Sequence, residues 1–156
     1  MLVETEHLLR DAFRRLEFPA VILRVAGIYG LGRGHLFKQF LAGEARIEGT
    51  GGRILNMIHR DDAAGCVAAA LERGIPGDIY NAVDDEPVSQ LVFLKWLADA
   101  LGKGLPPMAA GPPDARKRGA TNKRISNQKL KAQLNYPFKY PDFRAGYRAE
   151  LQRLGR

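Results

Sequence analysis

The hydrophobic and polar positions at the start of the chain predict an α-helix. Residues 3–16 place apolar or amphipathic side chains mostly three to five positions apart, with acids early in the segment and arginines late. This order suits the helix dipole, which favours negative charge at its start and positive charge at its end. The positions assigned to the apolar face are Val3, His7, Leu8, Phe13 and Leu16.

A strand and a second helix are expected next. Residues 20–25 are apolar without polar alternation until Arg24. Such a run is typical of a strand covered on both faces, as in a parallel sheet. Residues 27–34 then form a loop with four glycines. A short helix is expected over residues 35–41, ended by Gly43.

Strands and helices continue to alternate in the rest of the chain. Strands are expected at residues 46–48, 54–58 and 78–83. Helices are expected over residues 63–71, capped by Asp61 or Asp62; 90–101, capped by Ser89; 127–134, capped by Ser126; and 141–154, with Pro141 in the first turn. Residues 102–118 are expected to be a loop and residues 122–125 to be extended. The order is that of an α/β fold.

Composition places the chain among globular proteins. Its 156 residues are 46% hydrophobic and 26% charged, which excludes disordered and fibrous chains. The single cysteine, Cys66, cannot form an internal disulfide and lies among small apolar residues, so we expect a core thiol. The longest apolar run, residues 63–71, is too short to span a bilayer. The expected location is therefore the cytoplasm.

Charge is unevenly distributed along the chain. Residues 1–102 hold 11 basic and 14 acidic residues, a net charge of −3, whereas residues 103–156 hold 13 basic and 3 acidic residues, a net charge of +10. A basic segment of this kind often meets a polyanion or a phosphorylated small molecule. It lacks interleaved aromatic residues, so sequence-specific recognition of nucleic acid is not expected.

Two segments carry residue types that chemistry uses. The glycine-dense loop, residues 27–34, predicts either a phosphate-binding turn or a flexible connection between a strand and a helix. The segment His59-Arg60-Asp61-Asp62 has the groups of acid–base chemistry, although an aspartate that caps the next helix and a histidine packed at a strand end explain it as well. One histidine and two adjacent carboxylates predict no metal site.

Several segments, in this order and spacing, resemble the C-terminal half of the extended short-chain dehydrogenase/reductases, the NAD-dependent epimerase/dehydratase or nucleoside-diphosphate-sugar epimerase family. They are VILRVAGIYG (21–30), IHRDDAA (58–64), GDIYNA (77–82), EPVS (86–89) and NKRISNQKL (122–130). The segment NMIH (56–59) is similar to an atypical, YeeZ-like branch of the family. The resemblance implies part of a Rossmann-like doubly wound fold with a small substrate-binding α/β subdomain.

The resemblance divides the chain and leaves part of the family pattern out. Residues 1–45 resemble the end of the Rossmann-like part, and residues 46–156 mostly the substrate-binding part. The family's G-x-x-G-x-x-G loop and its Tyr-x-x-x-Lys pair do not occur in this sequence. The helix at residues 3–16 resembles the tail of the helix that carries that pair. No catalytic residue is therefore assigned, and the chain alone is expected to be inactive.

The remaining site residues are those that the resemblance implies. Contact with an NAD or NADP cofactor is expected at Val25, Ala26, Gly27 and Tyr29. Contact with an anionic small-molecule substrate is expected at Arg53, His59, Arg116, Arg118 and Arg124. The family's usual substrate residues are altered here, since Gly27 stands where an asparagine is common and Leu55 where a phosphate-binding arginine is common.

The expected function is that of the substrate-binding portion of an oxidoreductase or isomerase of this family. The expected partners are a separate N-terminal nucleotide-binding half or a second copy of the chain, with no nucleic acid and no membrane. A different class of function stays open, in which the chain is a non-catalytic module that binds an anionic partner through its basic C-terminal third.

Overall fold

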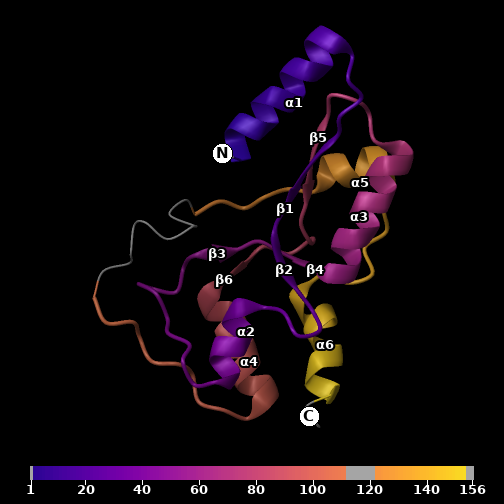
Figure 1. Cartoon of the computed structure of the whole chain (residues 1–156). Coiled ribbons are helices and arrows are strands. Elements are labelled where there is room, and N and C mark those ends of the chain that lie inside the picture. The colour runs from indigo at the N-terminus through magenta and orange to yellow at the C-terminus, as the bar shows by residue number, and fades with distance from the viewer. Residues whose placement is uncertain (1, 112–121, 154–156) are drawn as a thin grey trace.

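The computed structural model describes residues 2–111 and 122–153 and has a mixed α/β architecture (Figure 1). Its helices are α1 (Leu2–Leu16), α2 (His35–Leu41), α3 (Arg60–Arg73), α4 (Gln90–Leu101), α5 (Gln128–Leu134) and α6 (Phe143–Arg153). Its strands are β1 (Ile22–Val25), β2 (Gly27–Tyr29), β3 (Ile54–Leu55), β4 (Met57–His59), β5 (Ile79–Ala82) and β6 (Val88–Ser89). The α/β prediction is confirmed.

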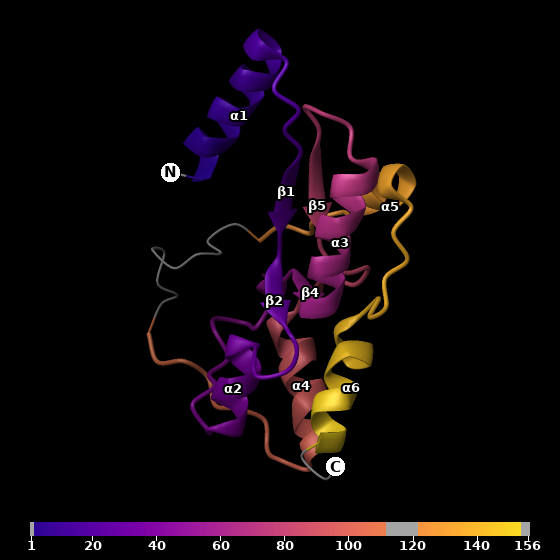
Figure 2. The ribbon, with the colours of Figure 1, turned by 45° about the vertical axis from the view of Figure 1, so that its right-hand side comes forward.

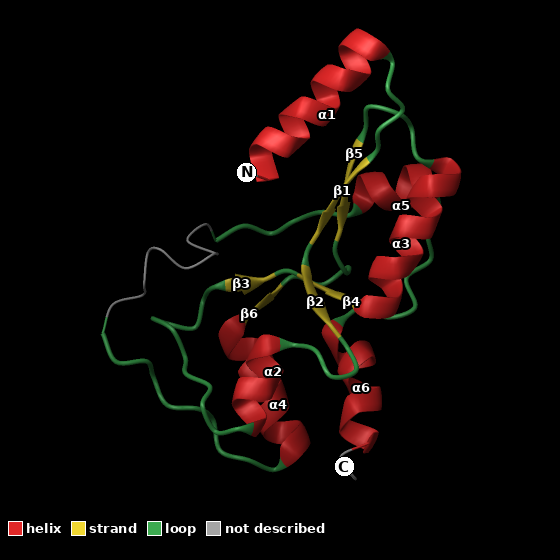
Figure 3. Cartoon of the chain, in the orientation of Figure 1, coloured by secondary structure: helices red, strands yellow, loops and turns green. Residues whose placement is uncertain are grey.

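The strands form three small sheets (Figure 3). β1 pairs in parallel with β5, so that Leu23 lies opposite Tyr80. β2 pairs in parallel with β4, so that Ile28 lies opposite Ile58. β3 and β6 are antiparallel. Because only Ala26 separates β1 from β2, the chain passes directly from one parallel pair to the next.

Two clusters of buried side chains hold the elements together. In the first cluster, α5 packs against β5, and α3 packs against α5 and β1, with Cys66, Tyr80 and Leu130 fully buried. The burial of the free Cys66 thiol confirms the predicted core thiol, and it raises the pKa of that thiol to about 12. The second cluster joins α2, α4 and α6 through aromatic rings, among them Phe37, Phe93, Phe143 and Tyr147.

Helix α1 stands apart from the other helices in the two views of Figures 1 and 2. None of its side chains is buried. Its links to the rest of the described chain include the ion pair of Glu6 with Arg24 and the contact of the Phe13 ring with Gly77. The helix forms as its pattern predicts, but its apolar residues Leu2, Val3, Leu8 and Leu16 are exposed.

Pairing between strands changes three of the predicted elements. Gly27–Tyr29, expected to be loop, is β2 because it pairs with β4. The strand expected at residues 54–58 is divided at Asn56 into β3 and β4, which belong to different sheets. The strand expected at residues 46–48 is reduced to a single bridge between Ile47 and Met108.

Helix ends also differ from their predictions. The cap of α3 is His59, not Asp61 or Asp62, because the helix already begins at Arg60. Ser89 caps α4 as predicted, since its hydroxyl accepts the backbone N–H of Val92. The helix expected from Ser126 begins at Gln128 and that expected from Pro141 begins at Phe143.

None of the helices that the structure describes is long and apolar enough to cross a membrane. The division of the chain at residues 45 and 46 stays a prediction.

Candidate functional site

The backbone between β1 and β2 forms an exposed strip. Val25 is 42% exposed and Ile28 is 38% exposed, and Gly27 between them is exposed as well. The backbone N–H of Gly27 donates to the carbonyl of Asn56 at 3.1 Å. A Cβ at Gly27 would lie 3.2 Å from that carbonyl oxygen, so glycine allows the two backbones to approach this closely. The strip is thereby fixed to the break between β3 and β4.

The side chain of Asn56 joins this strip to a distant part of the sequence. Its amide nitrogen donates to the carbonyl of Lys123 at 2.9 Å, and its amide oxygen accepts the backbone N–H of Ile125 at 2.9 Å. A side-chain amide that both donates and accepts in this way replaces the hydrogen bonds of a neighbouring strand. Asn56 therefore positions the basic segment beside Val25–Gly27.

Asn122 fixes the same segment at a second point. Its side-chain oxygen accepts the N–H of Ile54 at 2.7 Å, and its amide nitrogen donates to the carbonyl of Gly52 at 3.2 Å. These two residues flank Arg53, so the basic segment lies beside the backbone of Arg53. We call residues 25–27, 53–56 and 122–125 the Asn56 junction.

The charged groups of the Asn56 junction are partly engaged with protein atoms. Arg53 forms an ion pair with Glu48 at 3.3 Å. Arg124 donates through Nη1 to the carbonyl of Pro87 at 2.7 Å. Lys123 is exposed. The junction thus combines an exposed apolar strip with three cations, which suits a ligand that has a flat apolar part and an anionic part.

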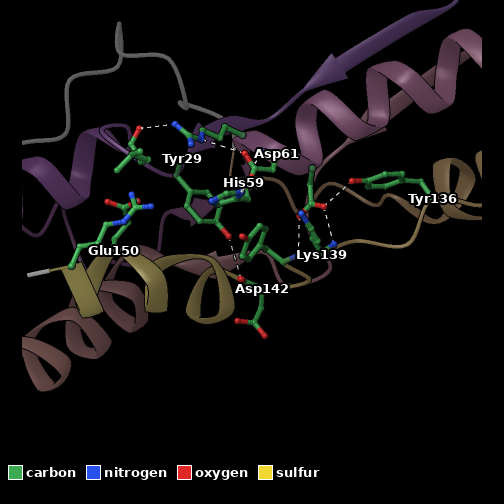
Figure 4. Close-up of polar contacts among 12 residues, drawn as sticks. Tyr29, His59, Asp61, Tyr136, Lys139, Asp142 and Glu150 are labelled. Carbon is green, nitrogen blue, oxygen red and sulfur yellow. Dashed lines mark hydrogen bonds and ion pairs between the residues drawn. The ribbon is translucent and has the colours of Figure 1, made fainter. Parts of the chain in front are cut away.

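Tyr29 and His59 lie in a buried aromatic cluster rather than at the junction (Figure 4). The Tyr29 ring is 1% exposed and stacks on Tyr147, with ring centroids 4.6 Å apart. Its hydroxyl donates to the backbone carbonyl of Asp142 at 3.2 Å. Burial raises the pKa of Tyr29, so the phenol stays protonated. Tyr29 therefore anchors the end of β2, next to the strip, in the buried aromatic cluster. Its own ring exposes almost no surface.

His59 connects this cluster to α3. Its Nδ1 accepts the N–H of Asp61 at 3.2 Å, and its ring lies 3.8 Å from that of Tyr140. An imidazole that accepts at Nδ1 is neutral and carries its proton on Nε2. Burial lowers the pKa of His59, which favours the same neutral form. The structure therefore gives His59 the packing role that the sequence allowed as one of two interpretations, and adds the helix cap that the sequence assigned to Asp61 or Asp62.

Sequence reasoning missed Asp62 as an organising residue. Its fully buried carboxylate accepts three hydrogen bonds, from the Tyr136 hydroxyl at 2.9 Å and from the backbone N–H groups of Lys139 at 2.8 Å and Tyr140 at 2.9 Å (Figure 4). These bonds satisfy a buried charge and fix the segment that places Tyr140 on His59. The only signal in the sequence was its place beside Asp61, which indicated a helix cap.

The structure brings together five of the predicted site residues: Val25, Ala26, Gly27, Arg53 and Arg124. It places Tyr29 and His59 in the buried cluster, and Arg116 and Arg118 lie outside the described residues. Among the residues described, no group of three or more histidine, cysteine or carboxylate side chains is placed to hold a metal ion.

The junction fits one part of a dinucleotide. The strip offers an apolar wall for a flat ring, since Val25 and Ile28 are exposed. A pyrophosphate needs several backbone N–H groups at a glycine turn before a helix. The glycine loop here leads into α2, a helix of only seven residues, and the space at Gly34 is filled by the Tyr147 hydroxyl. The described residues therefore fit the ring end and not the pyrophosphate.

No protein-family model matches the chain. Protein YeeZ from Escherichia coli K12 is 31% identical to it over 121 residues, which are 78% of this chain and 41% of YeeZ.

Solved structures match more of the chain. A functionally unknown conserved protein from Silicibacter pomeroyi is 35% identical, with a TM-score of 0.74, over 88% of this chain and 50% of that protein. A UDP-glucuronic acid 4-epimerase from Bacillus cereus, solved with UDP-glucuronic acid and NAD, is 25% identical, with a TM-score of 0.76, over 96% of this chain and 49% of the epimerase. Two dTDP-glucose 4,6-dehydratases, 18% and 17% identical, share the fold.

The chain thus spans about half the length of the proteins that it matches. Its structural neighbours include epimerases and dehydratases of the NAD-dependent family, and the prediction of part of a Rossmann-like fold is confirmed.

Proposed function

We propose that this chain is the C-terminal, substrate-binding portion of an NAD(P)-dependent epimerase/dehydratase-like oxidoreductase. The observation that carries this proposal is the Asn56 junction, which joins the strip at Val25–Gly27 to the cationic segment at residues 122–125 through two side-chain hydrogen bonds. These two segments are far apart in the sequence, and folding brings them side by side. The resulting surface contains residues of both segments. The epimerase from Bacillus cereus, which shares this fold, was solved with NAD and a nucleotide sugar.

In this proposal the two parts of the junction bind different ligands. Val25, Ala26 and Gly27 form the wall beside the nicotinamide ring, and Tyr29 holds that wall in place from the core. Arg53 and Arg124, with Arg116 and Arg118, attract the anionic part of a small-molecule substrate. His59 acts through Tyr29 and Tyr140, whose rings it contacts, so its role is to position the strip.

The chemistry of the reaction requires groups that these 156 residues do not supply. When bound, NAD(P) would supply hydride transfer to and from a carbon of the substrate, and this chemistry would need an acid–base group to move a proton at the oxygen on that carbon. None of the five tyrosines has a lysine four positions later, and no G-x-x-G-x-x-G segment occurs. We therefore predict that the purified chain binds substrate weakly and shows no dehydrogenase or epimerase turnover.

The test is to follow backbone amide NMR shifts of the purified chain while adding NAD, NADP or UDP-glucuronic acid. Shifts are expected at residues 25–27 for the dinucleotides and at residues 53–56 and 122–125 for the nucleotide sugar, and they should decrease with added salt. Lys123→Gln should weaken the second response by roughly threefold or more, whereas Lys95→Gln, on the exposed side of α4, should leave it unchanged.

Two outcomes contradict the proposal. Ligand-induced shifts confined to other parts of the chain would remove the junction as the binding surface. Oxidation or reduction of a nicotinamide cofactor by the purified chain would remove the prediction of inactivity.

A further inference from the structure

The connection between β5 and β6, residues 83–87, lies against the basic segment of the Asn56 junction. Arg124 donates through Nη1 to the carbonyl of Pro87 at 2.7 Å. Just past the junction, the buried side-chain amide of Asn127 donates to the carbonyl of Val83 at 2.9 Å. The β5–β6 connection thus helps to hold the basic segment in place.

The same connection is bonded to β4 on the other side of the junction. The backbone N–H of Asp84 donates to the carbonyl of Met57 at 2.8 Å, and Met57 directly follows Asn56 in the chain. The β5–β6 connection therefore joins the strand beside Asn56 to the basic segment. If it moves outward, hydrogen bonds on both sides of the junction lengthen together.

The side chain of Asp84 points into the protein from this connection. It is 1% exposed, and its Oδ2 has no hydrogen-bond partner in the described structure. The titratable groups near it are carboxylates and a phenol: Asp142 before α6, Tyr29 on β2, and its neighbours Asp85 and Glu86. Burial and repulsion by the carboxylates both raise the pKa of Asp84, to about 8.

The cations near this connection are engaged with its other two carboxylates. Lys131 pairs with Asp85 at 2.9 Å, and Arg144 pairs with Glu86 at 2.7 Å. A buried carboxylate without an ion-pair partner is costly, and hydration is the way to satisfy it. Because Asp85 is exposed and Glu86 is half-buried, the connection lies at the surface. A small outward movement would therefore let water reach Asp84.

We infer that Asp84 is a pH-sensitive switch for the Asn56 junction. While its carboxyl group is neutral, the β5–β6 connection stays bonded to β4 and to the basic segment. When the proton is lost to solvent, the connection moves outward to hydrate the carboxylate, and the bonds that hold Arg124 and Asn127 weaken. Binding of an anionic substrate then decreases as pH rises. This inference rests on the proposed function, because it describes the regulation of the same binding surface.

The experiment follows side-chain methyl resonances of the full chain by NMR from about pH 6.5 to about pH 9.5. Methyl protons do not exchange with water, so they are observed over the whole range. Met57 reports on β4 and Ile125 on the basic segment, while Leu101, buried at the end of α4, is the reference. Met57 and Ile125 should titrate together with a midpoint near pH 8, and Leu101 should not titrate.

Three variants identify the group that titrates. Asp84→Asn keeps a neutral side chain of similar size and should abolish both titrations. Glu86→Gln removes a carboxylate near Asp84 and should move the midpoint to lower pH, which tests the switch even if Asp84→Asn does not fold. Asp99→Asn removes an exposed carboxylate on α4 and should titrate as the wild type does.

Ligand binding is measured separately, with UDP-glucuronic acid at both ends of this pH range. The wild type should bind it roughly fivefold or more weakly at the higher pH, whereas Asp84→Asn should bind it equally at both. The variant retains every arginine, lysine and histidine, so the comparison removes the effect of their titration.

The outcomes separate the switch from the proposed function. A titration that persists in Asp84→Asn, a titration of Met57 without Ile125, or none at all would overturn the inference. Joint titration of Met57 and Ile125 without binding of UDP-glucuronic acid at any pH would support the switch and contradict the proposed function. Equal binding by the wild type at both pH values would overturn the switch and leave the proposed function intact.

Discussion

The carboxyl group of Asp84 is buried just after β5, and one of its oxygens has no hydrogen-bond partner in the described structure. Its other oxygen accepts the N–H of Glu86 at 3.3 Å. Burial, together with the nearby carboxylates of Asp142, Asp85 and Glu86, raises the pKa of Asp84 to about 8. Asp84 is therefore protonated in the folded chain at neutral pH.

This shift makes stability depend on pH. An unfolded aspartate loses its proton near pH 4, whereas folded Asp84 keeps it to about pH 8. Between these values the folded state binds more protons, so its free energy of unfolding falls as pH rises through this range. Asp84→Asn mimics the protonated side chain, and we expect it to be more stable than the wild type by about 2 kcal/mol at pH 8.5.

Thermal unfolding of both proteins between pH 5 and pH 9 measures this difference. The control is Asp99→Asn, which removes an exposed carboxylate on α4 that is not among the groups that raise the pKa of Asp84. Wild-type and Asp84→Asn curves that stay parallel over the whole range would contradict the prediction.

For single residues, the sequence predicted side chains that form hydrogen bonds to near neighbours in the chain. It did not predict side chains that form hydrogen bonds to distant segments. Ser89 was predicted as a cap because its partner, Val92, is three residues away. Asn56 gave no such signal, because Lys123 and Ile125 are 67 and 69 residues further along. Its role depends on which segments tertiary packing brings together, and a hydrophobic pattern does not contain that information.

Among the elements, helices with a strong apolar pattern were predicted closely, and short strands were not. α4 begins and ends where its pattern and cap predicted. β2 was predicted as a loop because its glycine and its neighbours favour turns, and it becomes a strand only through pairing with β4. A strand of three residues is decided by its partner rather than by its own propensities.

The close packing of α6 on β2 gives a prediction about Gly146. A Cβ at this position would overlap the Tyr29 hydroxyl, which the tyrosine needs for its bond to Asp142. Alanine in a helix normally stabilises by about 1 kcal/mol relative to glycine. We expect Gly146→Ala to destabilise the chain by about 1–2 kcal/mol instead, because the overlap displaces a fully buried ring.

Chemical denaturation of Gly146→Ala beside Gly104→Ala measures this effect. Nothing lies within 4 Å of a Cβ at Gly104, so that control should change the free energy of unfolding by less than about 1 kcal/mol. If Gly146→Ala were as stable as the wild type, close packing of α6 would not hold Tyr29 in place. The proposed role of Tyr29 in positioning the exposed strip would then be contradicted.

For the molecule as a whole, folding brings cations of residues 103–156 next to acids of residues 1–102. The C-terminal part carries the net charge of +10, yet three of its described cations pair with acids of the preceding part. Lys129 pairs with Asp78 at 2.8 Å, Lys131 with Asp85 at 2.9 Å, and Arg144 with Glu86 at 2.7 Å. These pairs reduce the charge that the segment offers to a large anionic partner, which favours a small anionic ligand over the non-catalytic module.

Chromatography on heparin distinguishes these two functions. Binding to a polyanion requires several unpaired cations and weakens steeply with salt. We expect the wild-type chain to elute at low salt. The triple variant Asp78→Asn, Asp85→Asn, Glu86→Gln should elute later, because it frees three cations from their ion pairs.

A second triple variant is the control. Glu17→Gln, Glu44→Gln, Asp99→Asn has the same net charge as the first variant and neutralises exposed acids away from these ion pairs. It should elute earlier than the first variant, since its cations stay paired. Strong retention of the wild type, equal to that of the first variant, would show that the ion pairs do not mask the basic segment and would restore the polyanion-binding module.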